Sequence, residues 1–289
     1  MTHAFSADEV FVGCDVGGRT TTLTAEDVER YGAGTGDRHA WYRGPSPFGG
    51  AIAPALLYHS EVYRDLSWYL PNLVGNLHAR QEWELFHPIS MGDVVHTRST
   101  VVDRYSKRGR DYVVNEVLIT DASGRWLQRS RTHQSFLAGE PGEAMVVDKE
   151  RERRADRRFD VAADGEALTP LAKTVTLAMC QAFSGPHRNY HTDREMARAL
   201  GFPDIVVQGM MPICFLSELM TTAFGTGWYC GGKLSVNLVN VLWAEEAVTA
   251  HGQIRAVAPE GRRARVHCDV WVEKADGTKT VIGTASAIR

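Results

Sequence analysis

The sequence lacks the features of a secreted, membrane-spanning or metal-bound protein. Its five cysteines lie far apart and form no C-x-x-C pair, which favours free thiols over a disulfide framework or a zinc knuckle. The N-terminus has no basic-then-apolar leader. No uninterrupted apolar run reaches the roughly 18 residues that a membrane helix needs. We therefore expect a cytoplasmic protein without a membrane partner.

An excess of charge of either sign is also missing. The 289 residues include 32 basic and 35 acidic side chains, for a formal net charge of −3, which gives no reason to expect nucleic acid as a partner. Apolar residues make up 44% and charged residues 23%, as in ordinary soluble globular proteins. The length leaves open whether there are two different domains or one domain twice.

A charged stretch divides the chain into halves of similar size. It lies between Ala138 and Glu166 and contains a dense mixed-charge run from Asp148 to Asp160. Such a run buries little apolar surface and is typical of a solvated linker or an exposed helix. We predict an N-terminal domain over residues 1–140, a linker over 141–165 and a C-terminal domain over 166–289.

The two halves show the same order of strand and turn signals. Strand–turn–strand patterns have their turns at Gly124 and Gly277, which are 153 positions apart. Gly92-Asp93 and Glu245-Glu246 stand at the same offset, each before another strand-like run. A spacing kept over several elements favours duplication, although two hairpins can align by chance.

Helical signals precede the strands. Thr192-Asp-Arg-Glu195 is a capping-box pattern that predicts a helix capped by Thr192 and ended by Gly201. The apolar segment Val206–Phe224 predicts a buried central helix, and Ala51–Tyr63 is its expected N-terminal counterpart. Each half then has the pattern of a long helix wrapped by an antiparallel sheet, an α+β architecture.

The segment Ala182–Met211 gathers polar residues in the loop before the capped helix, where functional groups tend to lie. It resembles the hydratase-2 motif of the MaoC-like (R)-specific enoyl-CoA hydratases and 3-hydroxyacyl thioester dehydratases. Ser184-Gly185 matches the start of that motif and His191 its catalytic histidine. Gly209 lies where the family has the glycine whose backbone N–H binds the thioester oxyanion.

The resemblance covers nearly the whole chain and implies a double hotdog fold, two fused copies of a helix wrapped by a sheet. It implies a lyase that hydrates a 2-enoyl thioester or dehydrates a 3-hydroxyacyl thioester, with Ser184, Gly185 and Ser217 contributing to substrate binding. The substrate partner would be a thioester of coenzyme A or of acyl carrier protein. No cofactor is implied apart from coenzyme A as part of the substrate, and a homodimer is expected.

The C-terminal half departs from the family pattern at its acid. Pro186 replaces the catalytic aspartate, while His191 is retained as the base and Gly209 as the oxyanion donor. His187, Asn189 or a water held by Ser184 could supply the missing proton donor, and the residues do not decide between them. His187 and His191 lack the context of a zinc motif, so no metal site is expected.

The N-terminal half departs differently. Asp37 is kept after Thr35-Gly36, but Tyr42 stands where the histidine belongs and Ala53-Pro54 replaces the His-Gly pair. Proline has no N–H to donate to an oxyanion. Asp37 is a candidate acid only if it reaches across to the other half, so neither half has an intact Asp/His pair.

Two other functions fit the same residues. One is an acyl-CoA thioesterase on the same fold, and the other is a non-catalytic, acyl-thioester-binding subunit that completes a partner's site. The incomplete Asp/His pairs favour the second. Trp41, Trp68 and Trp83 fit a pocket for a bulky or aromatic acyl group, although packing in the core explains them equally well.

Overall fold

One antiparallel sheet dominates the structure, a computed structural model that describes residues 10–66, 76–137, 159, 161 and 164–289. The strand order is β1-β3-β4-β5-β2-β7-β10-β9-β8-β6. The strands are β1 (Asp15–Thr22), β2 (Leu77–Leu85), β3 (Val94–Lys107), β4 (Arg110–Asp121), β5 (Trp126–Leu137), β6 (Leu171–Thr174), β7 (Lys233–Leu238), β8 (Ala247–Glu260), β9 (Arg263–Lys274) and β10 (Lys279–Ile288). Most of the linker predicted over 141–165 lies outside the described residues.

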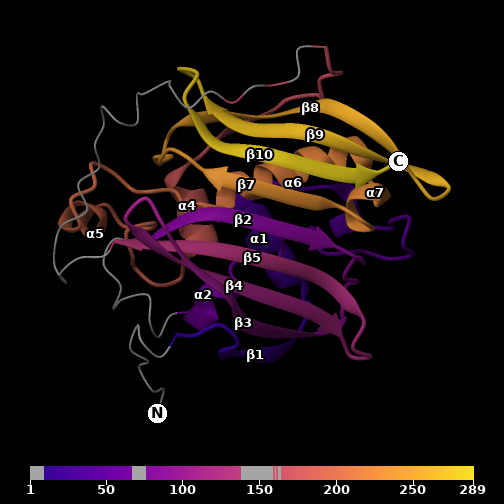
Figure 1. The fold of residues 1–289 in the computed structure, drawn as a ribbon, viewed down its shortest axis with the longest axis horizontal. Helices are drawn as coiled ribbons and strands as arrows, with labels where there is room; N and C mark the ends of the chain where they lie inside the picture. Colours follow the sequence, from indigo (N-terminus) through magenta and orange to yellow (C-terminus); the bar gives the residue numbers. More distant parts are fainter. Residues whose placement is uncertain (1–9, 67–75, 138–158, 160, 162–163) are drawn as a thin grey trace.

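The two halves of the sheet are copies of each other. Read outward from the central β2–β7 pair, each half has the same order of strands, and Figure 1 shows the first-half strands below and the second-half strands above. The pairs β3 and β8, β4 and β9, and β5 and β10 each begin 153 residues apart, as at Val94 and Ala247. The turns before β3 and β8 also share a backbone conformation, because Gly92 and Glu245 both have positive φ. The predicted duplication and α+β class are confirmed.

The helices lie mainly on one side of the sheet (Figure 1). They are α1 (Ala25–Thr35), the 3₁₀ turn η2 (Ala40–Tyr42), α2 (Glu61–Leu66), α4 (Leu177–Ser184), α5 (Arg194–Ala199), α6 (Met210–Phe224) and α7 (Thr226–Tyr229). The central helix expected within Val206–Phe224 is α6. It begins later than expected because Val206 forms a β-bridge with Trp243.

Two helix predictions are wrong in detail. The cap of α5 is Asp193, whose side chain accepts from the Met196 N–H, while the Thr192 hydroxyl contacts the preceding loop. The expected helix at Ala51–Tyr63 is replaced by a bridge and turns, with helix only in α2. Pro54 lies in that segment, and the residue before a proline avoids the helical region.

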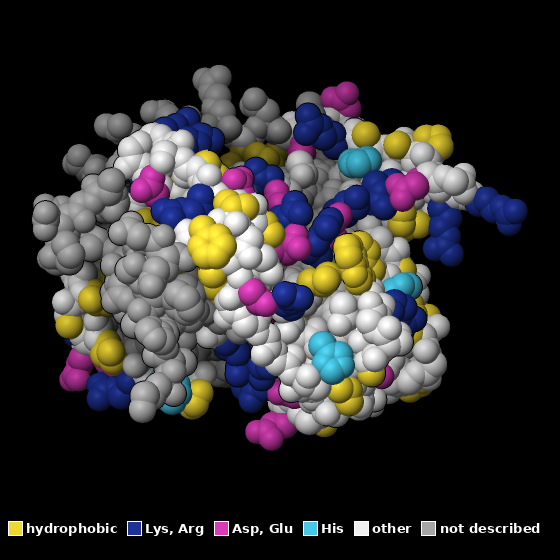
Figure 2. All heavy atoms as spheres, turned by 60° about the horizontal axis from the view of Figure 1, so that its bottom comes forward, with side chains coloured by type: hydrophobic (Ala, Val, Ile, Leu, Met, Phe, Trp, Pro, Cys, Tyr) yellow, Lys and Arg dark blue, Asp and Glu magenta, His cyan; other side chains and the backbone are white. Residues whose placement is uncertain are grey.

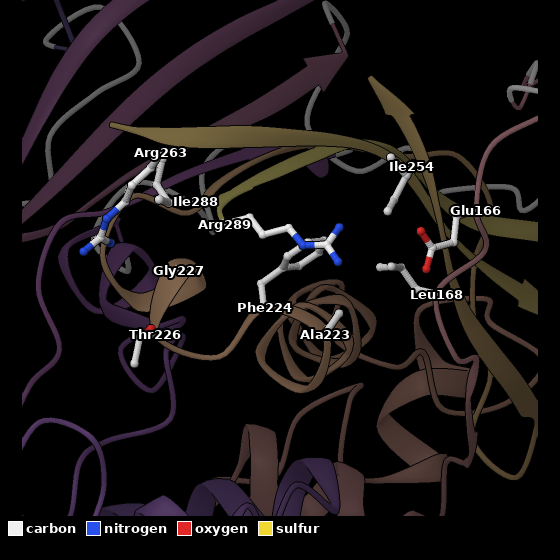
Figure 3. Close-up of a pocket in the computed structure, with 10 residues that line it drawn as sticks. All are labelled: Glu166, Leu168, Ala223, Phe224, Thr226, Gly227, Ile254, Arg263, Ile288 and Arg289. Atoms are coloured by element: carbon white, nitrogen blue, oxygen red, sulfur yellow. The ribbon is translucent and has the colours of Figure 1, made fainter. Parts of the chain in front are cut away.

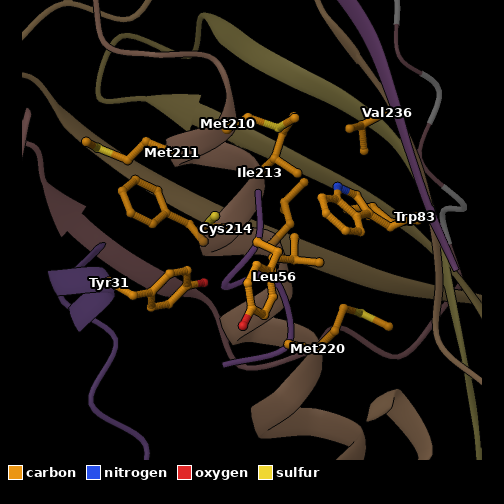
Figure 4. Packing of buried hydrophobic residues seen from close by; sticks show 14 of the residues in the cluster. Tyr31, Leu56, Trp83, Met210, Met211, Ile213, Cys214, Met220 and Val236 are labelled. Carbon is orange, nitrogen blue, oxygen red and sulfur yellow. The ribbon is translucent and has the colours of Figure 1, made fainter. Parts of the chain in front are cut away.

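The two halves share one hydrophobic core. In Figure 4, Leu56 and Trp83 from the first half pack beside Ile213 of α6 and Val236 of β7. Each of these side chains is at most 2% exposed. Burial at about 25 cal/mol per Å² of apolar surface makes this junction a main source of stability. Trp83 therefore belongs to the core, and Trp68 lies outside the described residues.

The surface carries acidic and basic side chains side by side, as Figure 2 shows for one face. On the outer face of the sheet, Arg129 pairs with Glu84 and Arg131 pairs with Glu116. The five cysteines are free thiols. No helix among the described residues is long and apolar enough to span a membrane.

Candidate functional site

The loop that follows α4 is folded around the side chain of Asn189. Its Nδ2 donates to the carbonyl oxygens of Ser184 and His187, both at 3.0 Å, and its Oδ1 accepts from the His191 N–H at 2.8 Å. The Asn189 amide thus satisfies three backbone groups of an irregular segment, which would otherwise lack partners. These contacts make Asn189 a residue that positions His191.

The His191 ring is fixed in one orientation. Its Nδ1 lies 2.7 Å from the carbonyl oxygen of Val206, so Nδ1 carries the proton and Nε2 is left as an acceptor. Burial lowers the pKa of His191 to about 4, against a smaller opposing effect of the Val206 carbonyl. The ring is therefore neutral near pH 7 and can accept a proton. Among the described residues, no carboxylate bonds to it, in keeping with Pro186.

Gly209 lies at the start of the long buried helix α6. The first backbone N–H groups of a helix have no partner within it and favour negative charge. A Cβ at this position would lie 2.3 Å from Leu238 Cδ2 and 3.3 Å from His78 Nδ1. Glycine therefore lets the helix start approach β7 and, across the junction, the beginning of β2.

Two residues of the first half lie opposite Gly209. The Tyr63 hydroxyl lies 3.0 Å from His78 Nδ1, and His78 Nε2 lies 3.1 Å from Oε1 of Gln81. Burial lowers the pKa of His78 to about 4 and raises the pKa of Tyr63, which is raised further by its neighbour Tyr190. The neutral His78 thus accepts from Tyr63 and donates to Gln81. Neither residue belongs to the motif, so the sequence offered no signal for them.

The remaining predicted residues of the second half are placed as follows. The Ser184 hydroxyl lies 3.3 Å from Oε1 of Gln208, next to Gly209. Gly185 ends α4, with its N–H donating to the Gln181 carbonyl. The buried Ser217 accepts from Nε1 of Trp228 at 3.0 Å, a contact between α6 and α7. The His187 side chain is exposed.

Asp37 lies in a separate buried cluster. Its Oδ2 accepts from the Tyr42 hydroxyl at 2.8 Å and its Oδ1 from the His39 N–H at 3.2 Å. Tyr42 occupies the position of the family's histidine, so the first half has a Tyr/Asp pair in place of His/Asp. Burial raises the pKa of Asp37 despite these hydrogen bonds. The structure shows Asp37 engaged with its own half of the motif.

A second carboxylate and one cation complete this cluster. Lys173 Nζ lies 2.7 Å from Oε2 of Glu218 on α6, and both side chains are less than a fifth exposed. Burial and the nearby Asp37 raise the pKa of Glu218 to about 7, against the opposing effect of Lys173. Trp41 packs against Tyr229 and Phe48 on the same side, with ring centroids about 6 Å apart. Aromatic side chains thus crowd the first-half motif.

A pocket of about 410 Å³ opens at the far end of α6. Figure 3 shows Arg289 reaching over Phe224 towards Glu166. None of the predicted site residues lines this pocket. No group of three or more candidate metal ligands occurs among the described residues.

Comparisons with known proteins agree with this fold. Residues 10–129 match the family model described as FAS1-like, dehydratase domain region. A structure named MaoC-like dehydratase has a TM-score of 0.74 and 16% identity, over 96% of this chain and 97% of that chain. A conserved hypothetical protein from Mycobacterium tuberculosis, described as having a double hotdog fold, has a TM-score of 0.63 and 13% identity over 97% and 96%.

A longer protein also contains this fold. Peroxisomal multifunctional enzyme type 2 from Drosophila melanogaster has a TM-score of 0.66 and 16% identity, and the match covers 94% of this chain but 48% of that one. No curated protein sequence matches the chain.

The fold class is therefore a double hotdog, as predicted. The matched family model covers less than half of this chain and these structures are 13–16% identical to it, so the likenesses show the fold.

Proposed function

We propose that the protein is a hydro-lyase that adds water to a 2-enoyl thioester or removes it from a 3-hydroxyacyl thioester. The observation that carries the proposal is the pairing of a neutral, oriented His191 with the start of α6 at Gly209. A base and a positive helix end are the two features this chemistry needs. We propose coenzyme A as the carrier and acyl carrier protein as the alternative.

In the hydration direction, Nε2 of His191 accepts a proton from the water whose oxygen bonds to C3 of the enoyl group. The electron pair of the double bond moves towards the thioester oxygen, where the Gly209 N–H donates to the developing negative charge. The protonated Nε2 of His191 then gives its proton to C2, which completes the addition of water and returns the ring to its neutral form. Dehydration is the reverse sequence, with the hydroxyl leaving from C3 as water.

We propose that the Tyr63–His78 pair takes the place of the missing aspartate. It is supported by the approach of His78 to Gly209 and by the proximity of Tyr63 to Tyr190, the neighbour of His191. The raised pKa of Tyr63 keeps its hydroxyl protonated, and this hydroxyl donates to Nδ1 of His78. Asn189 and Ser184 hold the loop after α4 in place through hydrogen bonds. Asp37 has a structural role in the first half.

Substitution of the base tests the proposal. We expect His191→Ala to lower kcat/KM for enoyl-CoA hydration by about 10²–10⁴-fold, followed through the loss of enoyl absorbance. His96→Ala, a histidine on β3 that bonds to Thr20 on β1, is the matched control and should keep full activity. Equal turnover by His191→Ala and the wild type would rule out His191 as the base.

The same preparation separates the other candidate functions. Release of free thiol from a saturated acyl-CoA, detected with a thiol-reactive dye, would identify a thioesterase. Binding of acyl-CoA without turnover by the isolated chain would favour a non-catalytic subunit that completes a partner's site.

A further inference from the structure

The sheet of the first half buries polar side chains on the face that points to the core. Six of them share this face with Trp83 and Leu85, and each is at most 2% exposed. They are Gln81, Ser99, Asn115, Gln128, Thr132 and Gln134. Buried amides and hydroxyls are unfavourable unless hydrogen bonds satisfy them, so their presence calls for a physical reason.

The second half shows that the fold does not require polar residues there. At the 153-residue offset the six positions are occupied by small or apolar residues, which pack on the same face of the second-half sheet. They are Leu234, Gly252, Cys268, Val281, Ala285 and Ala287. The same architecture therefore accepts an apolar lining, and the polar lining is specific to the first half.

Four of these groups form two neighbouring sets of hydrogen bonds across the sheet, which together are here called the polar row. Ser99 and Asn115 bond to each other, and the Thr132 hydroxyl donates to Gln81 Oε1 at 2.8 Å. His78 bonds to the same Gln81 oxygen. The row thus runs from β3 through β4 and β5 to β2, and it ends beside Gly209.

Gln134 lies next to the polar row, and its side chain makes no well-formed hydrogen bond with the described residues. It lies directly opposite His78 in the β2–β5 ladder and is 1% exposed. Its amide lies close enough to Tyr63 to lower the pKa of that hydroxyl, yet neither Nε2 nor Oε1 makes a hydrogen bond of good geometry with a described residue. One donor and one acceptor are therefore buried together beside the proposed thioester site.

We propose that the first half binds an acyl chain bearing a group that both donates and accepts hydrogen bonds, such as a hydroxyl, and that Gln134 recognises this group. This inference rests on the proposed acyl-thioester function and adds the class of acyl chain to it. A plain alkyl chain leaves the Gln134 amide unsatisfied, whereas an oxygen-bearing chain supplies its missing partners. A site built to bond a substrate hydroxyl discriminates strongly against the analogue that lacks it.

Calorimetric binding of two saturated thioesters tests the inference without any chemical step. The probes are hexanoyl-CoA and its ω-hydroxylated form. We expect the wild type to bind the hydroxylated form roughly 10-fold more tightly. Gln134→Ala should bring the two affinities within about 2-fold, because Ala removes both amide groups. The second half already holds Ala287 at this position, so the fold accommodates the change.

Two further variants sharpen the test. Arg131 lies on the outer face of the same strand, so Arg131→Ala should keep the preference for the hydroxylated probe. Thr132→Ala, which matches Ala285 of the second half, should weaken it and replaces Gln134→Ala if that variant fails to fold. Equal affinities in the wild type, preference for the alkyl chain, or a preference that survives Gln134→Ala would overturn the inference.

The outcome separates this inference from the hydro-lyase proposal. Tighter binding of the hydroxylated probe with no turnover of its 2-enoyl form would contradict the lyase and support the binding site. Turnover of both 2-enoyl forms with equal kcat/KM would support the lyase and contradict the inference.

Discussion

At the scale of single residues, burial sets the protonation state of the titratable groups near the proposed site. His191 and His78 are both held neutral near pH 7 by desolvation; one ring nitrogen of His191 and both ring nitrogens of His78 bond to neighbours. Glu218 is shifted in the other sense, because burial and Asp37 favour its protonated form. None of these shifts is visible in a motif, since each depends on residues distant in the chain.

Glu218 should make stability depend on pH. Its folded pKa of about 7 lies above its ordinary value of 4.5, so the folded state keeps a proton that the unfolded state releases. Stability from this group therefore falls as pH rises between about 4.5 and 7, and the loss is complete above that window. The free energy of unfolding of Glu218→Gln minus that of the wild type should therefore increase by on the order of 2 kcal/mol from pH 5 to pH 8.

Urea unfolding of both proteins at the two pH values measures this gain. The comparison with the wild type cancels the opposite pH dependence of the buried histidines, whose lowered pKa values make stability rise with pH. A difference between the two proteins that stays constant with pH would show that Glu218 does not titrate in this range.

At the scale of elements, a short loop and a helix start create the site together. Asn189 holds the loop, and the bridge between Val206 and Trp243 fixes the strand that carries the carbonyl partner of His191. Gly209 then begins α6 directly beyond it. The His191 ring and the start of α6 are therefore positioned by neighbouring backbone, not by a shared side-chain network.

Removal of the Asn189 amide should disturb this arrangement. We expect Asn189→Ala to lower kcat/KM by about 10–100-fold with little change in melting temperature, because three loop hydrogen bonds are lost in a partly exposed segment. Arg188→Ala is the control, since that exposed side chain pairs only with Asp193 and Glu195 in the described contacts. Steady-state kinetics and thermal unfolding measure both, and an unchanged kcat/KM would exclude this positioning role.

At the scale of the whole molecule, the two copies form one folding unit, and each copy supplies different residues to the proposed site. β2 pairs with β7 at the centre of the sheet, and the Tyr229 hydroxyl donates to the Ala53 carbonyl across the junction. The second half contributes the His191 loop and α6, while the first half contributes His78, Tyr63 and the polar row. The first half thus buries polar side chains at positions where the second half has small or apolar ones.

We expect residues 166–289 alone not to form a folded monomer. Removing the first half exposes the β7 edge and the face of α6 that packs on Leu56 and Trp83. Light scattering should show self-association and a hydrophobic dye should bind strongly. A monomer with cooperative unfolding would contradict the shared core. Light scattering of the full chain likewise tests the proposed homodimer.

Much of the fold could be predicted from the sequence. The turns at Gly124 and Gly277, their 153-residue offset and the alternating strands depend on local chemistry, which a sequence pattern records well. The cap at Thr192 and the helix at Ala51–Tyr63 were wrong because competing partners, the Asn189 loop and the bridge at Ile52, come from elsewhere in the fold.

By itself the sequence determined the duplicated strands and the central helix, because periodicity and spacing are local properties, and it predicted a functional loop around His191. Only the tertiary structure brought His78 to Gly209, with Tyr63 and Gln134 beside His78, and placed Asp37 with Tyr42 and Glu218 instead. The approach of His78 to Gly209 follows from the pairing of β2 with β7 between the halves, and a pairing partner distant in the chain leaves no mark in the local pattern of residues.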